Sequence, residues 1–272
     1  MVRSLWTAAT GMIAQQNNVD TIANNLANVN TTGYKTEVAE FKSLLYQDIQ
    51  AKTTSGSGET KPVGAQVGLG VRNSSVTSRF TQGNFYDSTN DLAFAVSGDG
   101  FFGIKGQDGN TYYTRNGDFH LATYGTNKLA LTTSDGNCVL DSTGKPIEFG
   151  SNIISSNITV SGDGEICYPD ESNNPKPMGI KIGLWQFNNP TGLEKIGDSS
   201  YSVSAASGPA MNETTTNGLV KSDLRQGYLE GSNVQVVDEM VNMIVAQRAY
   251  ELNSKAIQAT DEMMGQANSL RR

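Results

Sequence analysis

The 272-residue sequence has very little of the side-chain chemistry on which enzymes and metal proteins depend. It contains one histidine, His120, and two cysteines, Cys138 and Cys167. A single histidine on a predicted strand is more often a surface or core residue than a base or a ligand. Two cysteines do not form a metal site. They leave either one disulfide or, as we favour, two unpaired buried thiols.

Motifs for catalysis and cofactor binding are also missing. The sequence has no GxSxG pattern and no phosphate loop, and no pair of carboxylates stands out as a glycosidase pair. Its Asp/Asn/Gly turns lack the spacing and the closing Glu of a calcium loop. Aromatic pairs such as Phe101-Phe102 and Tyr112-Tyr113 are more simply core residues than a sugar platform. We therefore expect no enzyme, no catalytic residue, no cofactor and no metal.

Long apolar runs and an excess of basic residues are absent too. No segment approaches the ~20 apolar residues of a membrane helix, so we expect no direct membrane insertion. The first residues are too polar for the core of a secretory signal. This predicts either a cytoplasmic protein or one exported by a route that keeps its N-terminus. The net charge of −7 argues against nucleic-acid binding, which needs a basic face.

Proline and glycine are scarce at the two ends of the chain. All seven Pro and 26 of the 29 Gly lie between Tyr46 and Gly231. The ends can therefore form helices, whereas the middle has the composition of strands and turns. The ends are also nearly neutral, so copies of them can pack together without strong repulsion. The acidic middle suits a solvated surface.

The first segment repeats apolar residues at a seven-residue period, which predicts a helix over residues 3–29 that ends at Thr31-Thr32-Gly33. Gly33 is free to adopt a positive φ. Two apolar columns form the seam: Leu5, Met12, Val19 and Leu26 in one, and Ala8, Ile22 and Val29, interrupted by Gln15, in the other. Six asparagines crowd the second half: Asn17, Asn18, Asn24, Asn25, Asn28 and Asn30. Each alone is typical of a solvated or frayed helix, and the cluster equally fits hydrogen bonds to a neighbouring helix.

The last segment, from Val234 to Leu270, is also apolar at helical spacing. Ser232 or Asn233 can cap this helix, and Asp238 and Glu239 suit its first turns. One stripe comprises Val237, Val241, Val245, Ala249, Leu252, Ala256, Ala259, Met263, Ala267 and Leu270, and a second includes Met240, Ile244 and Ile257. A helix that is apolar on more than one side has more than one neighbour.

The middle of the chain reads as strands joined by turns. Residues 34–50 form a second helical or mixed segment. Residues 51–72 are a Gly/Ser/Thr/Lys-rich stretch typical of a flexible linker, and the alternation of Val67, Leu69 and Val71 predicts that its end becomes a strand. Five Asp-Gly or Asn-Gly pairs predict hairpins, beginning at Asp99, Asp108, Asn116, Asp135 and Asp163. The segments 97–100 and 161–164 share the sequence Ser-Gly-Asp-Gly, which is weak evidence for a duplication.

These patterns predict a mainly β protein with α-helical termini. Residues 1–33 and 232–272 pair as a helical coiled-coil assembly domain, residues 34–75 are a linker, and residues 76–231 form a central antiparallel β domain. The expected assembly interface comprises Leu5, Met12, Val19, Ile22, Asn24, Asn25, Leu26, Asn28, Val29, Val241, Ile244, Val245, Ala249, Leu252, Ala256 and Met263. In the unassembled chain we expect both ends to be largely disordered, because an apolar seam without a partner does not hold a helix.

Several stretches of the sequence together resemble motifs of the bacterial flagellar rod and hook proteins. At the N-terminus they are residues 4–12 (SLWTAATGM) and 23–35 (ANNLANVNTTGYK). At the C-terminus they are residues 226–234 (QGYLEGSNV), 239–244 and 247–256 (QRAYELNSKA). In the middle, VSGDGFF at 96–102, YTRNG at 113–117 and GLE at 192–194 also match. Within the family the length favours the distal rod. So does the stretch 46–70, which looks like the extended hairpin-like insertion typical of distal rod proteins. Residues 124–177 depart most from the pattern.

The resemblance implies a homo-polymer that forms a hollow helical tube and transmits torque from motor to hook. It implies neighbours among other rod proteins and the hook protein, and surrounding ring proteins in a Gram-negative envelope. It also implies a place in the flagellar basal body, reached through the flagellar export apparatus without a cleaved signal. The alternatives are a proximal rod or hook-family paralogue, a secreted adhesin-like fibre subunit and, least favoured, a wall hydrolase.

Overall fold

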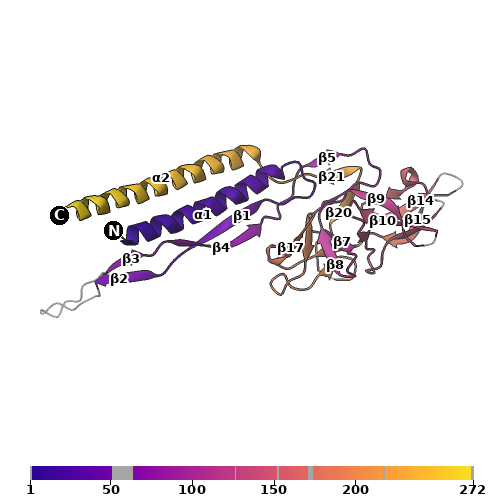
Figure 1. Ribbon diagram of the computed structural model, residues 1–272. Coiled ribbons are helices and arrows are strands. Elements are labelled where there is room, and N and C mark those ends of the chain that lie inside the picture. Colours follow the sequence, from indigo (N-terminus) through magenta and orange to yellow (C-terminus); the bar gives the residue numbers. More distant parts are fainter. Residues whose placement is uncertain are drawn as a thin grey trace, which may run out of the picture. The chain divides into compact units, whose positions relative to one another are not determined.

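The structure is a computed structural model that describes residues 2–50, 64–125, 127–151, 153–170, 174–216 and 218–270. It is mainly β, with one helix near each end of the described chain, which confirms the predicted fold class (Figure 1). The chain divides into two compact units. Unit 1 comprises Met1–Ala27, Glu37–Thr77 and Gln235–Arg272, and unit 2 comprises Asn28–Thr36 and Ser78–Val234.

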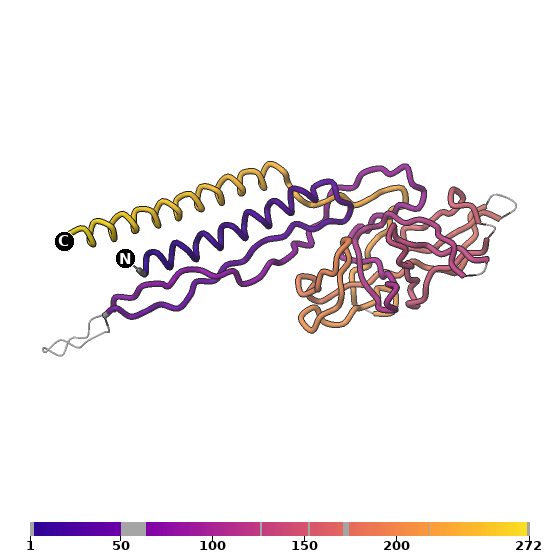
Figure 2. The backbone as a smooth tube through the Cα atoms, viewed as in Figure 1, coloured from indigo at the N-terminus to yellow at the C-terminus, as the bar shows by residue number. Residues whose placement is uncertain are grey.

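Unit 1 contains the two helices, α1 (Val2–Ala27) and α2 (Val236–Ser269). They lie side by side and run antiparallel, so the beginning of α1 and the end of α2 lie at the same end of unit 1 (Figure 2). Gly11 of α1 faces Asn253 of α2, and a β-carbon at Gly11 would lie 2.9 Å from the Asn253 Nδ2 atom. The absence of a side chain at Gly11 therefore allows the two helices to approach closely.

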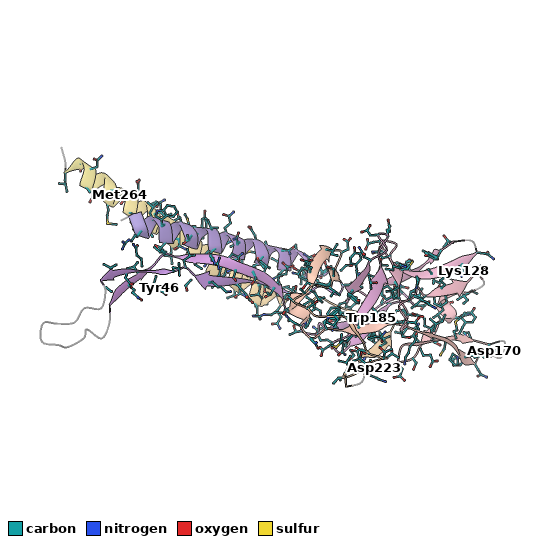
Figure 3. All side chains as sticks on the ribbon, turned by 90° about the horizontal axis from the view of Figure 1, so that it is seen from below. Tyr46, Lys128, Asp170, Trp185, Asp223 and Met264 are labelled. Carbon is teal, nitrogen blue, oxygen red and sulfur yellow. The ribbon has the colours of Figure 1, made fainter. Side chains whose placement is uncertain are left out.

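A two-stranded ribbon completes unit 1. Strand β1 (Glu37–Ser43) pairs with β4 (Val71–Ser78), and β2 (Tyr46–Gln50) pairs antiparallel with β3 (Ala65–Gly68). Helix α1 packs on β1 and lies between α2 and the ribbon (Figure 1). The ring of Tyr46, labelled in Figure 3, covers Gly68 on the opposite strand.

The ribbon corrects the expectation of a helical or mixed segment at residues 34–50. Phe41, Leu45 and Ile49, which suggested helical spacing, are all exposed: Phe41 and Ile49 lie on strands, and Leu45 lies in the link between β1 and β2. The strands form because their partners lie about 15 to 40 residues further along the chain, and such pairing overrides local propensity. The central part of the predicted insertion, residues 51–63, lies outside the described residues.

The helix ends differ slightly from expectation. Helix α1 ends at Ala27, and Gly33 has the predicted positive φ, +70°. Helix α2 begins at Val236 after Gln235, which makes no side-chain capping bond, so capping by Ser232 or Asn233 is wrong. The amide side chain of Asn233 instead binds other segments of unit 2.

Unit 2 is built from antiparallel strands. A ten-stranded sheet has the order β12-β10-β11-β7-β8-β18-β17, with β9 beside β10, β16 beside β7 and β19 beside β16. The strands β13-β14-β15 form a smaller sheet, and β20 pairs with β6 and β21 with β5. The strand bounds are Phe85–Asp87 (β5), Phe94–Ser97 (β6), Phe101–Lys105 (β7), Thr111–Thr114 (β8), Phe119–Thr123 (β9), Lys128–Thr133 (β10), Cys138–Val139 (β11), Glu148–Gly150 (β12), Thr159–Val160 (β13), Glu165–Pro169 (β14), Pro175–Lys181 (β15), Leu184–Gln186 (β16), Glu194–Gly197 (β17), Ser200–Ser202 (β18), Met211–Asn212 (β19), Asp223–Gln226 (β20) and Tyr228–Glu230 (β21). Two short 3-10 helices span Ser155–Asn157 and Pro190–Gly192.

Strand β7 contributes side chains to both apolar clusters of unit 2, because its successive side chains point to opposite faces. Phe102 belongs to the larger cluster and meets Phe119 edge to face, whereas Phe101 belongs to an aromatic cluster that includes Trp185 (Figure 3). Successive residues of a strand point to opposite faces, so neighbouring phenylalanines fill different clusters. The expectation that these aromatics are core residues is confirmed.

Three of the five predicted hairpins form. The turns at Asp108, Asp135 and Asp163 join adjacent paired strands, and the glycine after each has φ near +80°. The pairs at Asp99 and Asn116 do not form hairpins, because the strands on either side pair with other partners. An Asp-Gly pair fixes a local turn, but the partners of the flanking strands depend on the whole sheet.

Candidate assembly site

The residues expected on the N-terminal seam differ in their exposure. Ile22 and Asn25 are buried, Asn24 is exposed, and the others are half-buried: Leu5, Met12, Val19, Leu26, Asn28 and Val29. Asn28 and Val29 belong to unit 2. The buried face of α1 otherwise consists of small residues, Ala8, Ala14 and Thr21. The seam is therefore only partly covered within one chain.

Asn25 is the asparagine that organises unit 1. Its side-chain oxygen accepts a hydrogen bond from the Glu37 amide, and its Nδ2 donates to the Glu37 carbonyl, both at 2.8 Å. The same Nδ2 lies 3.3 Å from Glu239 Oε2 on α2. The side chain thus pairs with the first residue of β1 as a neighbouring strand does, and it also reaches the second helix. Hydrogen bonding, rather than fraying, explains this member of the cluster.

The residues expected on the C-terminal helix lie on its outer surface. Val241, Ile244, Val245, Leu252 and Met263 are between 51% and 66% exposed, Ala256 is exposed and Ala249 is half-buried. The buried residues of α2 are Ala246 and Thr260. The structure therefore does not bring these predicted apolar residues against α1. We call Val241, Ile244, Val245, Leu252 and Met263 the outer row of α2.

Unit 1 also has an open groove of about 390 Å³, which is lined by residues of both helices. It is lined by Gln16 and Val19 of α1 and by Gln247, Tyr250 and Glu251 of α2. Next to it, Arg248 and Glu251 form an exposed ion pair at 2.8 Å. The groove combines apolar atoms with amide and carboxylate groups, as protein interfaces commonly do.

Unit 2 contains a buried charge cluster that the sequence analysis missed. Lys35 Nζ lies 2.6 Å from Glu230 Oε1, and Arg115 Nη1 lies 3.3 Å from Glu230 Oε2. The side chains of all three residues, which we call the Glu230 cluster, are at most 2% exposed. Each of the three residues lies in one of the stretches that resemble the flagellar family, and this is their only sequence signal. Their burial could not be predicted, because it depends on contacts with residues far away in the chain.

Burial and charge act in opposite directions on this cluster. Burial lowers the pKa of Lys35 below its ordinary value, while the Glu230 carboxylate partly opposes that change. Burial likewise lowers the pKa of Arg115. The guanidinium of Arg115 also donates to the Gly98 carbonyl at 2.8 Å and lies 4.8 Å from the centre of the Phe101 ring.

Other candidate chemistry finds no support among the described residues. His120 is exposed on β9, and no group of three or more His, Cys, Asp or Glu side chains there is placed to hold a metal ion. Both cysteines are free; Cys138 is buried and Cys167 is half-buried, so the expectation of buried thiols holds fully only for Cys138. No helix in the described ranges is long and apolar enough to span a membrane.

A helix pair with an apolar outer row is typical of a structural protein that assembles with further subunits. Comparison with known families agrees. Residues 5–35 match the model of the flagella basal body rod protein, residues 95–168 that of the flagellar hook protein FlgE/F/G D1 domain, and residues 225–270 that of the flagellar basal body rod FlgEFG protein C-terminal region.

Full-length relatives make the relationship specific. The chain is 46% identical to the flagellar basal-body rod protein FlgG of Borreliella burgdorferi over 276 residues, which cover all of both chains. It is 35% identical to FlgG of Bacillus subtilis over 272 residues, again covering both chains completely. It is 32% identical over 279 residues to the flagellar hook-basal body complex protein FlhP of the same species. The chain therefore belongs to the flagellar basal-body rod protein family, as the resemblance predicted, and is a structural protein of that rod.

Proposed function

We propose that the chain polymerises through its two terminal helices into the hollow, helical distal part of the rod, which transmits torque from the motor to the hook. The outer row of α2 carries this proposal. Five large apolar side chains more than half exposed on one helix are costly in water and become favourable when a neighbouring subunit covers them. The role is mechanical and requires no catalytic group.

The proposed partners follow from membership in the rod family. Copies of the chain form the tube, other rod proteins and the hook protein adjoin its two ends, and ring proteins surround it where an outer membrane is present. The chain reaches the basal body through the flagellar export apparatus and keeps its N-terminus. The predicted assembly residues of α1, above all Leu5, Met12, Val19 and Leu26, remain half-exposed and are available to the same neighbours.

The ribbon of unit 1 offers a second contact between subunits. Among the described strands, β2 and β3 pair only with each other, so each has an outer edge without a strand partner. Leu45, Tyr46 and Ile49 are all exposed on it. We assign these residues to stiffening contacts between neighbouring copies in the rod.

The proposal is tested by Leu252→Asp in a strain whose own gene has been deleted. The introduced charge would have to be buried in the helical layer, so we expect non-motile cells with truncated rods and no hooks. Gln258→Asp is the matched control, because Gln258 is polar and exposed on the same helix, and it should restore swimming. Normal swimming with Leu252→Asp contradicts packing through the outer row.

The deletion strain itself separates the alternatives. Rods that stop short of their distal part, restored by the wild-type gene, support the distal rod. A missing proximal part supports a proximal rod paralogue, and similarity to FlhP makes a hook-family role the second candidate. Complete hooks and normal swimming in the deletion strain favour a different fibre, such as a secreted adhesin.

A further inference from the structure

Segments that are far apart in the sequence meet inside unit 2 at one carboxylate. Glu230, the last residue of β21, accepts hydrogen bonds from Lys35 Nζ at 2.6 Å, from the Gly83 amide at 3.0 Å and from Arg115 Nη1 at 3.3 Å. Its main-chain oxygen accepts another from the Gly33 amide at 2.8 Å. These contacts fasten the segment that follows α1 to the segment that precedes α2.

Asn233 makes a second connection between the same two segments. Its side-chain oxygen accepts hydrogen bonds from the amide and the hydroxyl of Thr36, both at 2.7 Å. Its Nδ2 donates to the carbonyls of Arg79 and Thr81, and the Thr81 carbonyl also accepts a hydrogen bond from Lys35 Nζ. The two connections therefore share the Thr81 carbonyl.

The backbones around the cluster approach one another too closely for side chains. A β-carbon at Gly33 would lie 2.7 Å from the Asn116 nitrogen and 2.8 Å from the Arg115 carbonyl carbon. A β-carbon at Gly83 would collide with the Gly231 carbonyl oxygen. Such close backbone contacts fix the position of the segment that follows α1 relative to the segment that precedes α2.

Stability alone does not account for a cluster of this composition. It buries two cations against one carboxylate, and the other carboxylates whose charge reaches them are Asp99, which is exposed, and Glu213. Arg115 Nε has no hydrogen-bond partner among the described residues. Well-packed apolar residues often stabilise such a site equally well or better, whereas buried ionic groups can specify one arrangement.

We propose that the Glu230 cluster is a latch that holds the two connecting segments, 28–36 and 231–234, together in the unassembled subunit, so that α1 and α2 start from adjacent fixed points. The latch deepens the proposed rod function, and its part in assembly rests on that function. It acts before neighbouring subunits supply any contacts.

Chain connectivity shows what the latch changes. With Lys35 held by Glu230, only residues 28–34 and 231–235 separate the helices from the fixed points. With the latch open, residues 28–77 are the only covalent connection between α1 and the rest of unit 2, which begins at Ser78. Because loop closure becomes less favourable as roughly the three-halves power of loop length, growth from about 12 to about 55 residues weakens pairing of the helices on the order of tenfold.

Amide hydrogen exchange in the full-length monomer tests the latch directly. In the wild type, the Gly33 and Gly83 amides should exchange as slowly as the Leu140 amide, which donates to the Gly103 carbonyl in the sheet. In Glu230→Gln, the first two should lose at least tenfold more protection than the Leu140 amide loses, which separates local opening of the latch from a general loss of sheet stability. Glu148→Gln, which breaks the exposed Lys128–Glu148 pair, is the matched control and should leave all three unchanged. Wild-type Gly33 and Gly83 amides that exchange as fast as those of α2 overturn the latch.

A covalent substitute tests the link to assembly. Thr36→Cys with Asn233→Cys is added to Glu230→Gln in a background where Cys138 and Cys167 are replaced by alanine. Sedimentable polymer should fall at least tenfold in Glu230→Gln, return when the disulfide is oxidised and fall again when it is reduced. Polymer that does not depend on the disulfide contradicts the latch. If the wild type shows latch protection but forms no rod, the rod function fails while the latch stands.

Discussion

At the scale of single residues, polar side chains set positions that apolar residues leave open. Asn25 joins α1, β1 and α2 through one amide group, and Glu230 joins four backbone segments through one carboxylate. Asn25 was among the residues predicted from the sequence, because its motif placed it beside the seam. Lys35, Arg115 and Glu230 were not, since their burial results from contacts between distant segments.

The first prediction at this scale concerns the stability of unit 2. Glu230→Gln leaves the buried Lys35 and Arg115 without their counter-charge, and breaking a buried pair in this way typically costs about 3–5 kcal/mol. Urea unfolding of the monomer followed by circular dichroism should show a loss of this order. Glu148→Gln, at the exposed pair with Lys128, should leave the transition unchanged. Equal effects of the two substitutions refute the special status of Glu230.

A second residue-scale prediction concerns how the free energy of unfolding changes at alkaline pH. Burial raises the pKa of Tyr113, which packs against Trp185 and Phe187. Below pH 10 the phenol is neutral in both states and its contribution to stability is complete. As the pH rises further, the unfolded chain ionises first, so stability falls through the raised folded pKa. Tyr113→Phe should lose less stability than the wild type above pH 10 in the same urea assay. Parallel losses contradict burial of this phenol.

At the scale of elements, the predictions were confirmed where local sequence signals decided the outcome and were wrong where long-range contacts decided it. The terminal helices and three hairpin turns followed from spacing and from Asp-Gly pairs, which act within a few residues. The segment 34–50 became strands because β3 and β4, far along the chain, pair with it. The α2 cap also failed, since Asn233 has better partners in unit 2 than the helix end offers.

The connection after α1 provides an element-scale prediction. Gly33→Ala places a β-carbon at a positive φ and against the backbone of Arg115 and Asn116, so a cost of about 1–3 kcal/mol is expected in urea unfolding of the monomer. Gly150→Ala is the control, because Gly150 has open space and no positive φ, and its effect should stay within about 0.5 kcal/mol. An equally stable Gly33→Ala protein is incompatible with the close approach described here.

At the scale of the whole molecule, the distribution of apolar surface separates the two units. Unit 2 encloses its two apolar clusters within one chain. In unit 1, the buried side of α2 consists of Ala246 and Thr260, while its largest apolar residues stay exposed. Little apolar area therefore holds the helix pair together in an isolated chain, whereas a polymer can bury the outer row.

The whole-molecule prediction is that the helices form mainly on assembly. The monomer should show weak helical circular dichroism at 222 nm, and the signal should rise when the protein polymerises, because neighbouring copies then cover the outer row. Amides of α1 and α2 should gain protection from exchange in the same step. Strong protection of both helices in the dilute monomer refutes coupled folding and assembly.

The sequence by itself determined the two end helices, the β character of the middle, the local turns and the family, because these depend on composition and on spacing between near neighbours. It also placed the outer row on α2, since a helix apolar on several sides has surface left over. Only the tertiary structure decided which strands pair, which side of α2 meets α1 and how Lys35, Arg115 and Glu230 come together. Each of these depends on contacts between residues far apart in the chain, where pairing energy and burial outweigh local preference.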